Sequence, residues 1–354
     1  MVDESIDFNK KKSLHQDLVD AGWPSDIVSK HLGLEKHPQS LAGSAIFVNN
    51  ISKSFGDHEV VKDVSFVVQS GEIFGLIGLS GAGKTTLLNM LVGFIEPTAG
   101  DVVVCSSAGQ NISVLKSPDL VKSVFGFSSQ QPSFYSKLSV KENLAYFGEL
   151  FGLTNQEIVE RSNELLGLVG LSGSENVLGG NLSGGMQKRL DIACALIHHP
   201  NILLLDEPTA DLDSLLRTQM WRIIKDINQK GTTVIVASHF IEDIENYCSR
   251  VAVLNNKTVS LIGSSDEIKN KYTTNYEVQL RTASEDYAYL LSSLKKSSLF
   301  ASSKLAEGGI IFYTSTPKKL LSELFRVVGK KGDSIVALDL ARPSLKEAFE
   351  SLVK

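Results

Sequence analysis

Hydrophobic positions along the chain predict two α/β segments joined by a short polar stretch. In residues 45–265, short apolar runs alternate with helical patterns; the apolar run 73–77, for example, leads through a glycine turn into the helical pattern 84–92. Residues 274–354 repeat the alternation on a smaller scale after the polar stretch 270–275. This pattern is typical of folds in which helices pack on a largely buried sheet.

The smaller segment, 274–354, is expected to be a separate accessory α/β domain. Its strands are predicted at 277–280, 310–313 and 335–340, and its helices at 284–294, 317–328 and 343–352. Residues 1–43 carry two short helical patterns, one before Gly22 and one before Gly33, with Ser25 as a plausible N-cap. We expect a helical hairpin too short to bury a core alone. Trp23 would dock it on the body or mark a partner surface, and docking is the simpler interpretation.

Composition and charge narrow the function classes. The 354 residues are 42% hydrophobic and 21% charged, as in an ordinary globular protein of two or three domains. A net charge of −5 gives no electrostatic reason to expect a nucleic-acid partner. The widely separated Cys105, Cys194 and Cys248 form no metal-like spacing and indicate a reducing compartment.

No uncharged apolar run has the length of a membrane-spanning helix, and the first twelve residues are too polar for a signal peptide. We therefore expect a cytoplasmic protein that borrows any membrane contact from a partner.

The run GLSGAGKT, from Gly78 to Thr85, fits the P-loop pattern and lies between a buried strand pattern and a helix start. Its glycines let backbone N–H groups surround phosphate oxygens, and the helix N-terminus adds partial positive charge. Lys84 would reach the β- and γ-phosphates of ATP, and the Thr85 hydroxyl would bind Mg²⁺. The alternative, a merely glycine-rich turn, does not explain this context. The predicted nucleotide-binding residues here are Gly78, Ser80, Gly81, Ala82, Gly83, Lys84, Thr85 and Thr86.

A second strand pattern ends in two acids. Residues 202–205 are four apolar residues in a row, followed by Asp206 and Glu207. Asp206 is placed to hold Mg²⁺ through water, and Glu207 can polarise the attacking water as a general base. A solvated strand exit is the alternative, but it is unconvincing beside an intact P-loop.

Another buried strand pattern, 231–238, ends at His239. A lone histidine is more often structural than catalytic. Because this strand should run parallel to the one before Glu207, we favour a contact with the γ-phosphate.

The run LSGGMQ, from Leu182 to Gln187, resembles the signature motif of the ATP-binding cassette (ABC) family, which other P-loop proteins lack. The resemblance covers residues 45–265 and implies a P-loop NTPase fold with a mixed sheet core and a helical subdomain around the signature motif. Other landmarks of the family are also present in the chain. Phe55 stands at the position of the adenine-stacking aromatic, Gln130 at that of the Q-loop glutamine and His239 at that of the H-loop histidine, and the D-loop corresponds to Asp211, Leu212 and Asp213.

The resemblance also implies roles for these residues. Ser183, Gly184 and Gly185, at a helix start, would bind the γ-phosphate of ATP held by a second ABC subunit, in a homodimer or a heterodimer. A helix N-terminus preceded by exposed glycines is an anion site by its own chemistry, whereas a C-cap or flexible turn is the alternative. Gln130 would take part in catalysis and bind Mg²⁺. Phe55 could instead be an ordinary core aromatic.

Two positions depart from the usual pattern of the family. Ser129 stands where proline commonly precedes the Q-loop glutamine, and Asp211 stands where the D-loop commonly has glycine or alanine. Neither touches the core chemistry. Because Lys84, Gln130, Asp206, Glu207 and His239 are all present, the site is expected to be catalytically complete.

Among ABC proteins, the chain is most similar to ATPase subunits of drug- and sodium-efflux export systems. It lacks the long coiled coils of DNA-repair cassettes and the second cassette typical of translation-associated ones. The resemblance implies an integral membrane permease that contacts residues 130–147 at the cytoplasmic face of the membrane. Exposed aromatics there would be interface anchors, although Leu138 and Leu144 are expected to fill the core of the subdomain. One alternative is an ABC ATPase that regulates a soluble partner. A second alternative is a metabolic kinase, but the signature motif argues against it.

Overall fold

The structure, a computed structural model, describes residues 44–105, 111–272, 276–294, 299–306, 308–341, 344–347 and 349. These residues form two compact units, one ending at Ile262 and the other beginning at Gly263. The helical hairpin predicted within residues 1–43 lies outside the described residues. In the described part of the chain, no helix combines the length and apolar character needed to cross a membrane.

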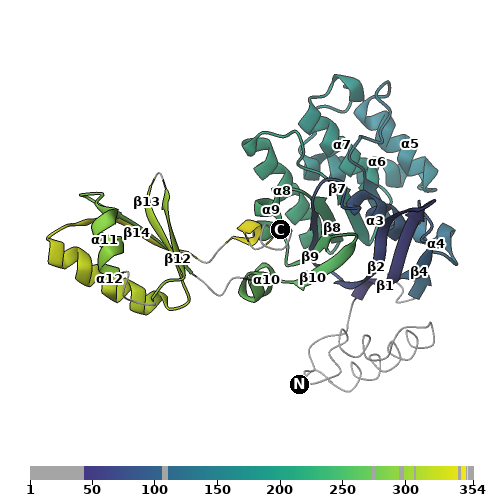
Figure 1. Ribbon diagram of the computed structural model, residues 1–354. Coiled ribbons are helices and arrows are strands. Elements are labelled where there is room, and N and C mark those ends of the chain that lie inside the picture. The colour runs from purple at the N-terminus through teal and green to yellow at the C-terminus, as the bar shows by residue number, and fades with distance from the viewer. Residues whose placement is uncertain are drawn as a thin grey trace, which may run out of the picture. The chain divides into compact units, whose positions relative to one another are not determined.

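The first unit contains two sheets (Figure 1). One is antiparallel with the order β2-β1-β4-β5, formed by β1 (Ser44–Phe55), β2 (His58–Gln69), β4 (Ala99–Cys105) and β5 (Asn111–Ser113). The other has the order β10-β9-β3-β8-β7-β6, formed by β3 (Ile73–Gly78), β6 (Phe125–Ser128), β7 (Ile202–Asp206), β8 (Thr233–Ser238), β9 (Arg250–Asn255) and β10 (Thr258–Gly263).

The second of these sheets is built on parallel strands. In it, β9, β3, β8, β7 and β6 pair in parallel with their neighbours. Every residue of β3, β7 and β8 is buried, which explains why their sequences are continuous apolar runs instead of alternating ones. The chain is therefore an α/β protein with a mixed sheet core, as predicted.

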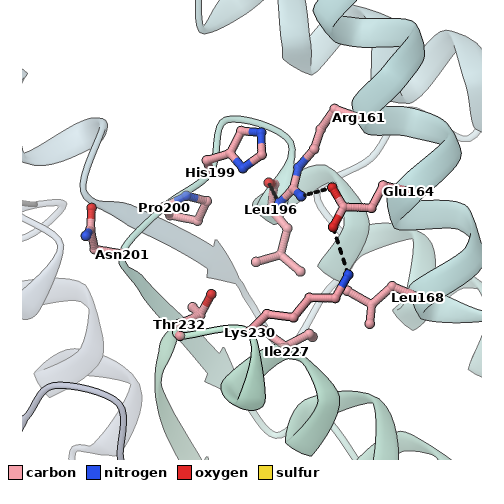
Figure 2. Close-up of a pocket in the computed structure, with 11 residues that line it drawn as sticks. Arg161, Glu164, Leu168, Leu196, His199, Pro200, Asn201, Ile227, Lys230 and Thr232 are labelled. Atoms are coloured by element: carbon pink, nitrogen blue, oxygen red, sulfur yellow. Dashed lines mark hydrogen bonds and ion pairs between the residues drawn. The ribbon is translucent and has the colours of Figure 1, made fainter.

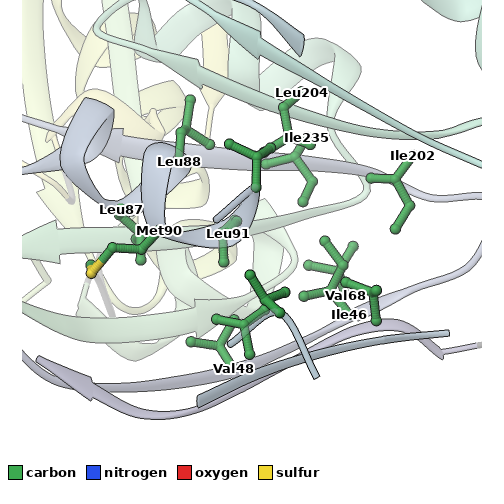
Figure 3. Packing of buried hydrophobic residues seen from close by; sticks show 14 of the residues in the cluster. Ile46, Val48, Val68, Leu87, Leu88, Met90, Leu91, Ile202, Leu204 and Ile235 are labelled. Carbon is green, nitrogen blue, oxygen red and sulfur yellow. The ribbon is translucent and has the colours of Figure 1, made fainter. Parts of the chain in front are cut away.

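Helix α3 (Lys84–Leu91) packs between the two sheets and ties them into one core (Figure 3). Its buried side chains meet apolar residues of both sheets, so the helix that starts at the phosphate loop is fixed by hydrophobic contacts along its length. The residues of this cluster labelled in Figure 3 are Ile46, Val48, Val68, Leu87, Leu88, Met90, Leu91, Ile202, Leu204 and Ile235.

The helical subdomain consists of α5 (Val140–Leu150), α6 (Asn155–Val169) and α7 (Gly184–Leu196). Both α5 and α6 begin with a capping box, in which Ser139 pairs with Glu142 and Thr154 with Glu157. Leu144 is fully buried, as predicted for a core residue, whereas Leu138 is only half-buried. The remaining helical elements of this unit are α4 (Pro118–Lys122), η1 (Gly179–Asn181), α8 (Ser214–Gln229) and α9 (Ile241–Tyr247).

The second unit begins with α10 (Ser265–Tyr272) and continues as β11 (Tyr276–Thr282), α11 (Tyr287–Leu294), β12 (Ser302–Ala306), β13 (Gly309–Thr314), α12 (Pro317–Lys331) and β14 (Ile335–Ala341). The strands pair antiparallel in the order β12-β13-β11-β14. A β-α-β-β-α-β chain with this order has ferredoxin-like topology. Its core joins β11 and β13 to α11 and α12.

Three details of this unit differ from the sequence-based expectation. The strand β12 was not predicted, because its mostly exposed residues show no apolar alternation and pair only along the edge with β13. Helix α11 begins at Tyr287, after a turn, instead of at Ser284. Helix α10 extends to Tyr272, so that residues 270–272 of the expected polar linker are helical.

Candidate active site

Four loops with candidate chemistry meet at one edge of the parallel sheet. The glycine run follows β3, Gln130 lies just after β6, Glu207 follows β7 and His239 follows β8. These four strands are parallel neighbours, so their carboxyl ends lie at the same edge, the usual binding edge of open α/β sheets. A cavity of about 410 Å³ opens there. It is lined by Val60, Ser80, Gly81, Gly83, Lys84, Thr85, Thr86, Gln130, Glu207 and His239.

The glycine loop depends on two left-handed residues. Gly81 has φ +80° and Gly83 has φ +102°, and a Cβ at Gly83 would lie 3.1 Å from the Val60 carbonyl oxygen. Gly83 is also the residue from which α3 starts, so the loop leads directly into a helix N-terminus. This geometry turns backbone N–H groups and the helix dipole toward the cavity, as phosphate binding requires. Gly78 and Ala82 belong to the loop without lining the cavity.

The Lys84 side chain lies beneath this loop and is buried. Its Nζ donates to the carbonyl oxygens of Gly78 at 2.9 Å and Leu79 at 3.4 Å, and it lies 3.8 Å from Glu207 Oε1. A buried ammonium with several N–H groups on the cavity wall is suited to binding phosphate oxygens.

Thr85 lines the cavity and contacts Asp206, which is buried and is not among the lining residues. The Thr85 hydroxyl donates to Asp206 Oδ2 at 2.8 Å, while Oδ1 of the same carboxylate is buried without a hydrogen-bond partner in the described structure. Burial raises the pKa of Asp206, and the Thr85 hydrogen bond partly opposes this shift. A hydroxyl and one carboxylate beside a phosphate loop fit Mg²⁺, which keeps several waters and takes few protein ligands.

Glu207 and His239 form a pair in the lining of the cavity. Glu207 has a left-handed backbone (φ +49°) and its N–H donates to the Ala237 carbonyl oxygen at 2.9 Å. This unusual conformation for a non-glycine residue is held by the junction of β7 and β8 and turns the carboxylate toward the cavity. Its Oε2 lies 2.8 Å from His239 Nδ1. A carboxylate held in this way can accept a proton from water in the cavity.

An interaction that the sequence did not reveal supports the histidine. The Phe240 ring centroid lies 4.1 Å from that of His239, and the guanidinium of Arg217, on α8, lies 3.8 Å from the Phe240 centroid. Arg217 also lies 3.8 Å from Asp243 on α9. Helix α8 thus contacts the loop of His239 through a cation–π interaction.

The signature segment starts a helix and does not cap the end of one. Ser183 is the N-cap of α7, and its Oγ accepts from the Met186 N–H at 3.4 Å. The C-cap alternative is therefore wrong. Ser183 and Gly184 are exposed, Gly185 is buried, and none of the three lines the cavity of the phosphate loop.

The adenine candidate and the D-loop also lie outside the cavity lining. Phe55 is 51% exposed, with the Lys53 ammonium 5.0 Å from its ring centroid, so the core-aromatic alternative is wrong. Asp211 has φ +60°, a conformation that suits the glycine common at this position and that aspartate tolerates. Asp213 is the N-cap of α8 and accepts from the Leu216 N–H at 2.9 Å.

A second cavity, of about 350 Å³, lies next to Asn201, at the end of β7 opposite the site (Figure 2). There Lys230 and Arg161 approach the same carboxylate, that of Glu164, from two sides. The Lys230 hydrogen bond, aided by Arg161 and opposed by partial burial, lowers the pKa of Glu164 to about 2. This cluster joins α6 of the helical subdomain to the end of α8 and forms no part of the phosphate site.

Known proteins share this architecture. Residues 61–210 match the family described as ABC transporter. The linearmycin resistance ATP-binding protein of Bacillus subtilis (strain 168) is 33% identical over 69% of this chain and 76% of its own length. The methionine import ATP-binding protein of Clostridioides difficile (strain 630) is 40% identical over 63% and 70%. A dimeric ATP-binding cassette in a post-hydrolysis state, bound to ADP and Pi, superposes with a TM-score of 0.55 and 28% identity over 62% and 98%.

Proposed function

This chain belongs to the ABC transporter family as an ATP-binding and ATP-hydrolysing subunit, and from that premise we propose that two cassettes close around two ATP molecules to drive a separate transmembrane permease. One observation carries the proposal. The residues for hydrolysis converge on one cavity, whereas the exposed helix start at Ser183 and Gly184 contributes nothing to that cavity. Each chain then holds one catalytic half-site and one separate anion-binding half-site, and pairing completes both.

The phosphate loop binds the nucleotide in this proposal. Backbone N–H groups of residues 80–86 surround the phosphates, and Lys84 turns its ammonium from the loop carbonyls to the β- and γ-phosphates. Thr85, Asp206 and Gln130 would hold Mg²⁺, which neutralises phosphate charge when bound. Phe55, exposed on its strand end, would stack on adenine. Ser183, Gly184 and Gly185 of the second subunit would bind the γ-phosphate from the other side.

Hydrolysis uses the pair of Glu207 and His239 in the lining of the cavity. Glu207 accepts a proton from the attacking water, and His239 keeps the carboxylate oriented and contacts the γ-phosphate. Once the γ-phosphate is cleaved, the two subunits lose the group that bridged them, and the dimer opens. The chemical step thereby resets the conformational cycle.

The permease would contact residues 130–147 from the cytoplasmic face of the membrane. Tyr135 and Tyr146 are 48% and 41% exposed, with ring centroids 4.9 Å apart and hydroxyls 3.2 Å apart, so they offer a rigid aromatic surface. A relative named for Nod factor export, from Sinorhizobium fredii (strain NBRC 101917 / NGR234), supports export, although another is named for methionine import. In this arrangement residues 45–265 are the nucleotide-binding domain and residues 274–354 an accessory domain.

The Glu207→Gln variant tests the proposal. It should bind ATP normally, hydrolyse it roughly 10²- to 10⁴-fold more slowly, and elute as a dimer from size exclusion with ATP but not with ADP. Adding Ser183→Arg should abolish that dimer, because the arginine side chain would block the second anion site. Glu160→Gln, on an exposed turn of α6, is the matched control and should behave as the wild type. Turnover at the wild-type rate in Glu207→Gln, or an ATP dimer insensitive to Ser183→Arg, would refute the proposal.

A further inference from the structure

Two charged residues inside the signature helix are buried and take no part in the chemistry described above. Lys188 is 8% exposed and Asp191 is 2% exposed, and they are three residues apart on α7, so they lie on the same face of the helix. Burying such charges is costly unless each is compensated. Their hydrogen bonds therefore indicate what the helix is built to hold.

Asp191 holds both ends of the Q-loop. Its Oδ2 accepts from the Ser128 hydroxyl at 2.5 Å, and its Oδ1 accepts from the Ser133 backbone N–H at 2.6 Å. Ser128 is the last residue of β6 and is fully buried, and Gln130 lies between these two anchors with its side chain exposed at the cavity. One carboxylate thus fixes the segment on either side of Gln130.

Lys188 holds the middle of the same loop. Its Nζ donates to the Ser129 carbonyl oxygen at 2.6 Å and lies 3.5 Å from the Asp206 carbonyl oxygen at the end of β7. Burial lowers the pKa of Lys188, an effect that the charges of Asp191 and Asp206 oppose. The ammonium therefore lies between the signature helix, the loop of Gln130 and the strand that carries the metal-binding carboxylate.

We propose that Lys188 and Asp191 are positioning residues that clamp the Gln130 loop to the signature helix, so that Gln130 follows this helix when Ser183 engages the nucleotide of a second subunit. The proposal rests on the proposed function, because it needs Gln130 to act at the phosphate site. In this arrangement the start of α7, at Ser183, contacts the ATP bound by the second subunit. Lys188 and Asp191, one to three turns later on the same helix, set the position of Gln130 at the ATP site of their own chain. A clamp of this kind makes hydrolysis at one site depend on the position of α7.

A double-mutant cycle with Gln130 tests the clamp. Lys188→Met keeps the apolar stem and should lower kcat for ATP hydrolysis by about 10- to 100-fold, the usual cost of misplacing a reacting group by an ångström. The Kd for ATP should change less than twofold. The Mg²⁺ concentration for half-maximal activity should rise. In the Gln130→Ala background, Lys188→Met should change kcat less than twofold, since it acts through Gln130.

Arg189→Met is the matched control. Arg189 is the next residue of α7, and its guanidinium donates to Gln219 on α8, away from the Q-loop. Its effect on kcat should be the same with and without Gln130. Lys188→Met leaves Asp191 buried beside fewer compensating charges and can therefore destabilise the fold. The double variant Lys188→Met/Asp191→Asn, which removes both charges, is therefore measured in the same assays. The pair should show the same dependence on Gln130 while keeping a wild-type-like melting temperature.

Two results would overturn the clamp, and they can be told apart. If Gln130→Ala lowers kcat but Lys188→Met lowers it by the same factor in both backgrounds, Lys188 is merely structural and the proposed function is unaffected. If Gln130→Ala changes neither kcat nor the Mg²⁺ dependence, the metal assignment of Gln130 fails together with the clamp.

Discussion

The Nδ1 atom of His239 lies 2.8 Å from Oε2 of Glu207, and the His239 backbone N–H donates to the same oxygen at 3.3 Å. One carboxylate oxygen is thus held from two directions by one residue. The other oxygen, Oε1, faces Lys84 at 3.8 Å. The orientation of Glu207 therefore depends on His239, just after β8, and on Lys84, the first residue of α3.

Replacing the histidine should separate binding from hydrolysis. His239→Ala leaves the backbone N–H in place but removes the imidazole that orients Glu207, so kcat should fall by about 10²-fold while the Kd for ATP stays within about threefold. Single-turnover hydrolysis and equilibrium nucleotide binding measure the two quantities. A variant that hydrolyses ATP like the wild type would show that the imidazole has no part in the reaction.

The Asp206–Thr85 contact predicts a specific metal dependence. Asp206→Asn weakens the ligand for Mg²⁺, so the Mg²⁺ concentration giving half-maximal hydrolysis should rise about tenfold or more, whereas ATP binding measured in EDTA should be retained. An unchanged Mg²⁺ titration would remove Asp206 from the metal site.

The same variant has an expected effect on stability. Burial raises the pKa of Asp206, which means that the folded apo protein disfavours the charged form. Asp206→Asn should therefore melt at the same or a higher temperature than the wild type without nucleotide at pH 7. A clear loss of apo stability would contradict this account of the carboxylate.

The Glu164 cluster predicts a pH-dependent contribution to stability. Because the folded-state pKa of Glu164 is lowered from 4.5 to about 2, the contribution is fully present above the unfolded-state pKa and is lost as the pH falls toward 2. Glu164 is 42% exposed, so solvent screening limits the effect to about 1 kcal/mol. Urea unfolding of Glu164→Gln should show this deficit at pH 7 and a smaller one at pH 3.5.

Salt provides the control for that measurement. The deficit of Glu164→Gln should shrink in 1 M NaCl, since ions screen exposed pairs. Glu160→Gln, one turn earlier on the same helix and without an ion pair to Lys230 or Arg161, should show no pH-dependent deficit. Equal behaviour of the two variants would mean that the ion pairs do not stabilise the junction of α6 and α8.

The candidate site could be predicted from sequence because its loops follow recognisable strands. The apolar runs before Gly78, Glu207 and His239 are recognisable locally, and parallel strands bring their carboxyl ends to one edge. The structure places Glu207, His239 and part of the glycine loop after β3 around one cavity, together with Gln130. The edge strand β12 was missed because edge pairing leaves its side chains in solvent and needs no apolar pattern.

The local sequence by itself determined which loop contains the glycines, which strand ends in two acids, and where the signature helix begins. Only the tertiary structure decided which side chains connect those loops to the neighbouring helices. Lys188, Asp191 and Arg217 look like ordinary surface residues of helices, and their partners are 18 to 63 positions away in the chain. A residue's burial and partners depend on which elements pack against it, and packing between distant segments leaves no periodic mark in the chain.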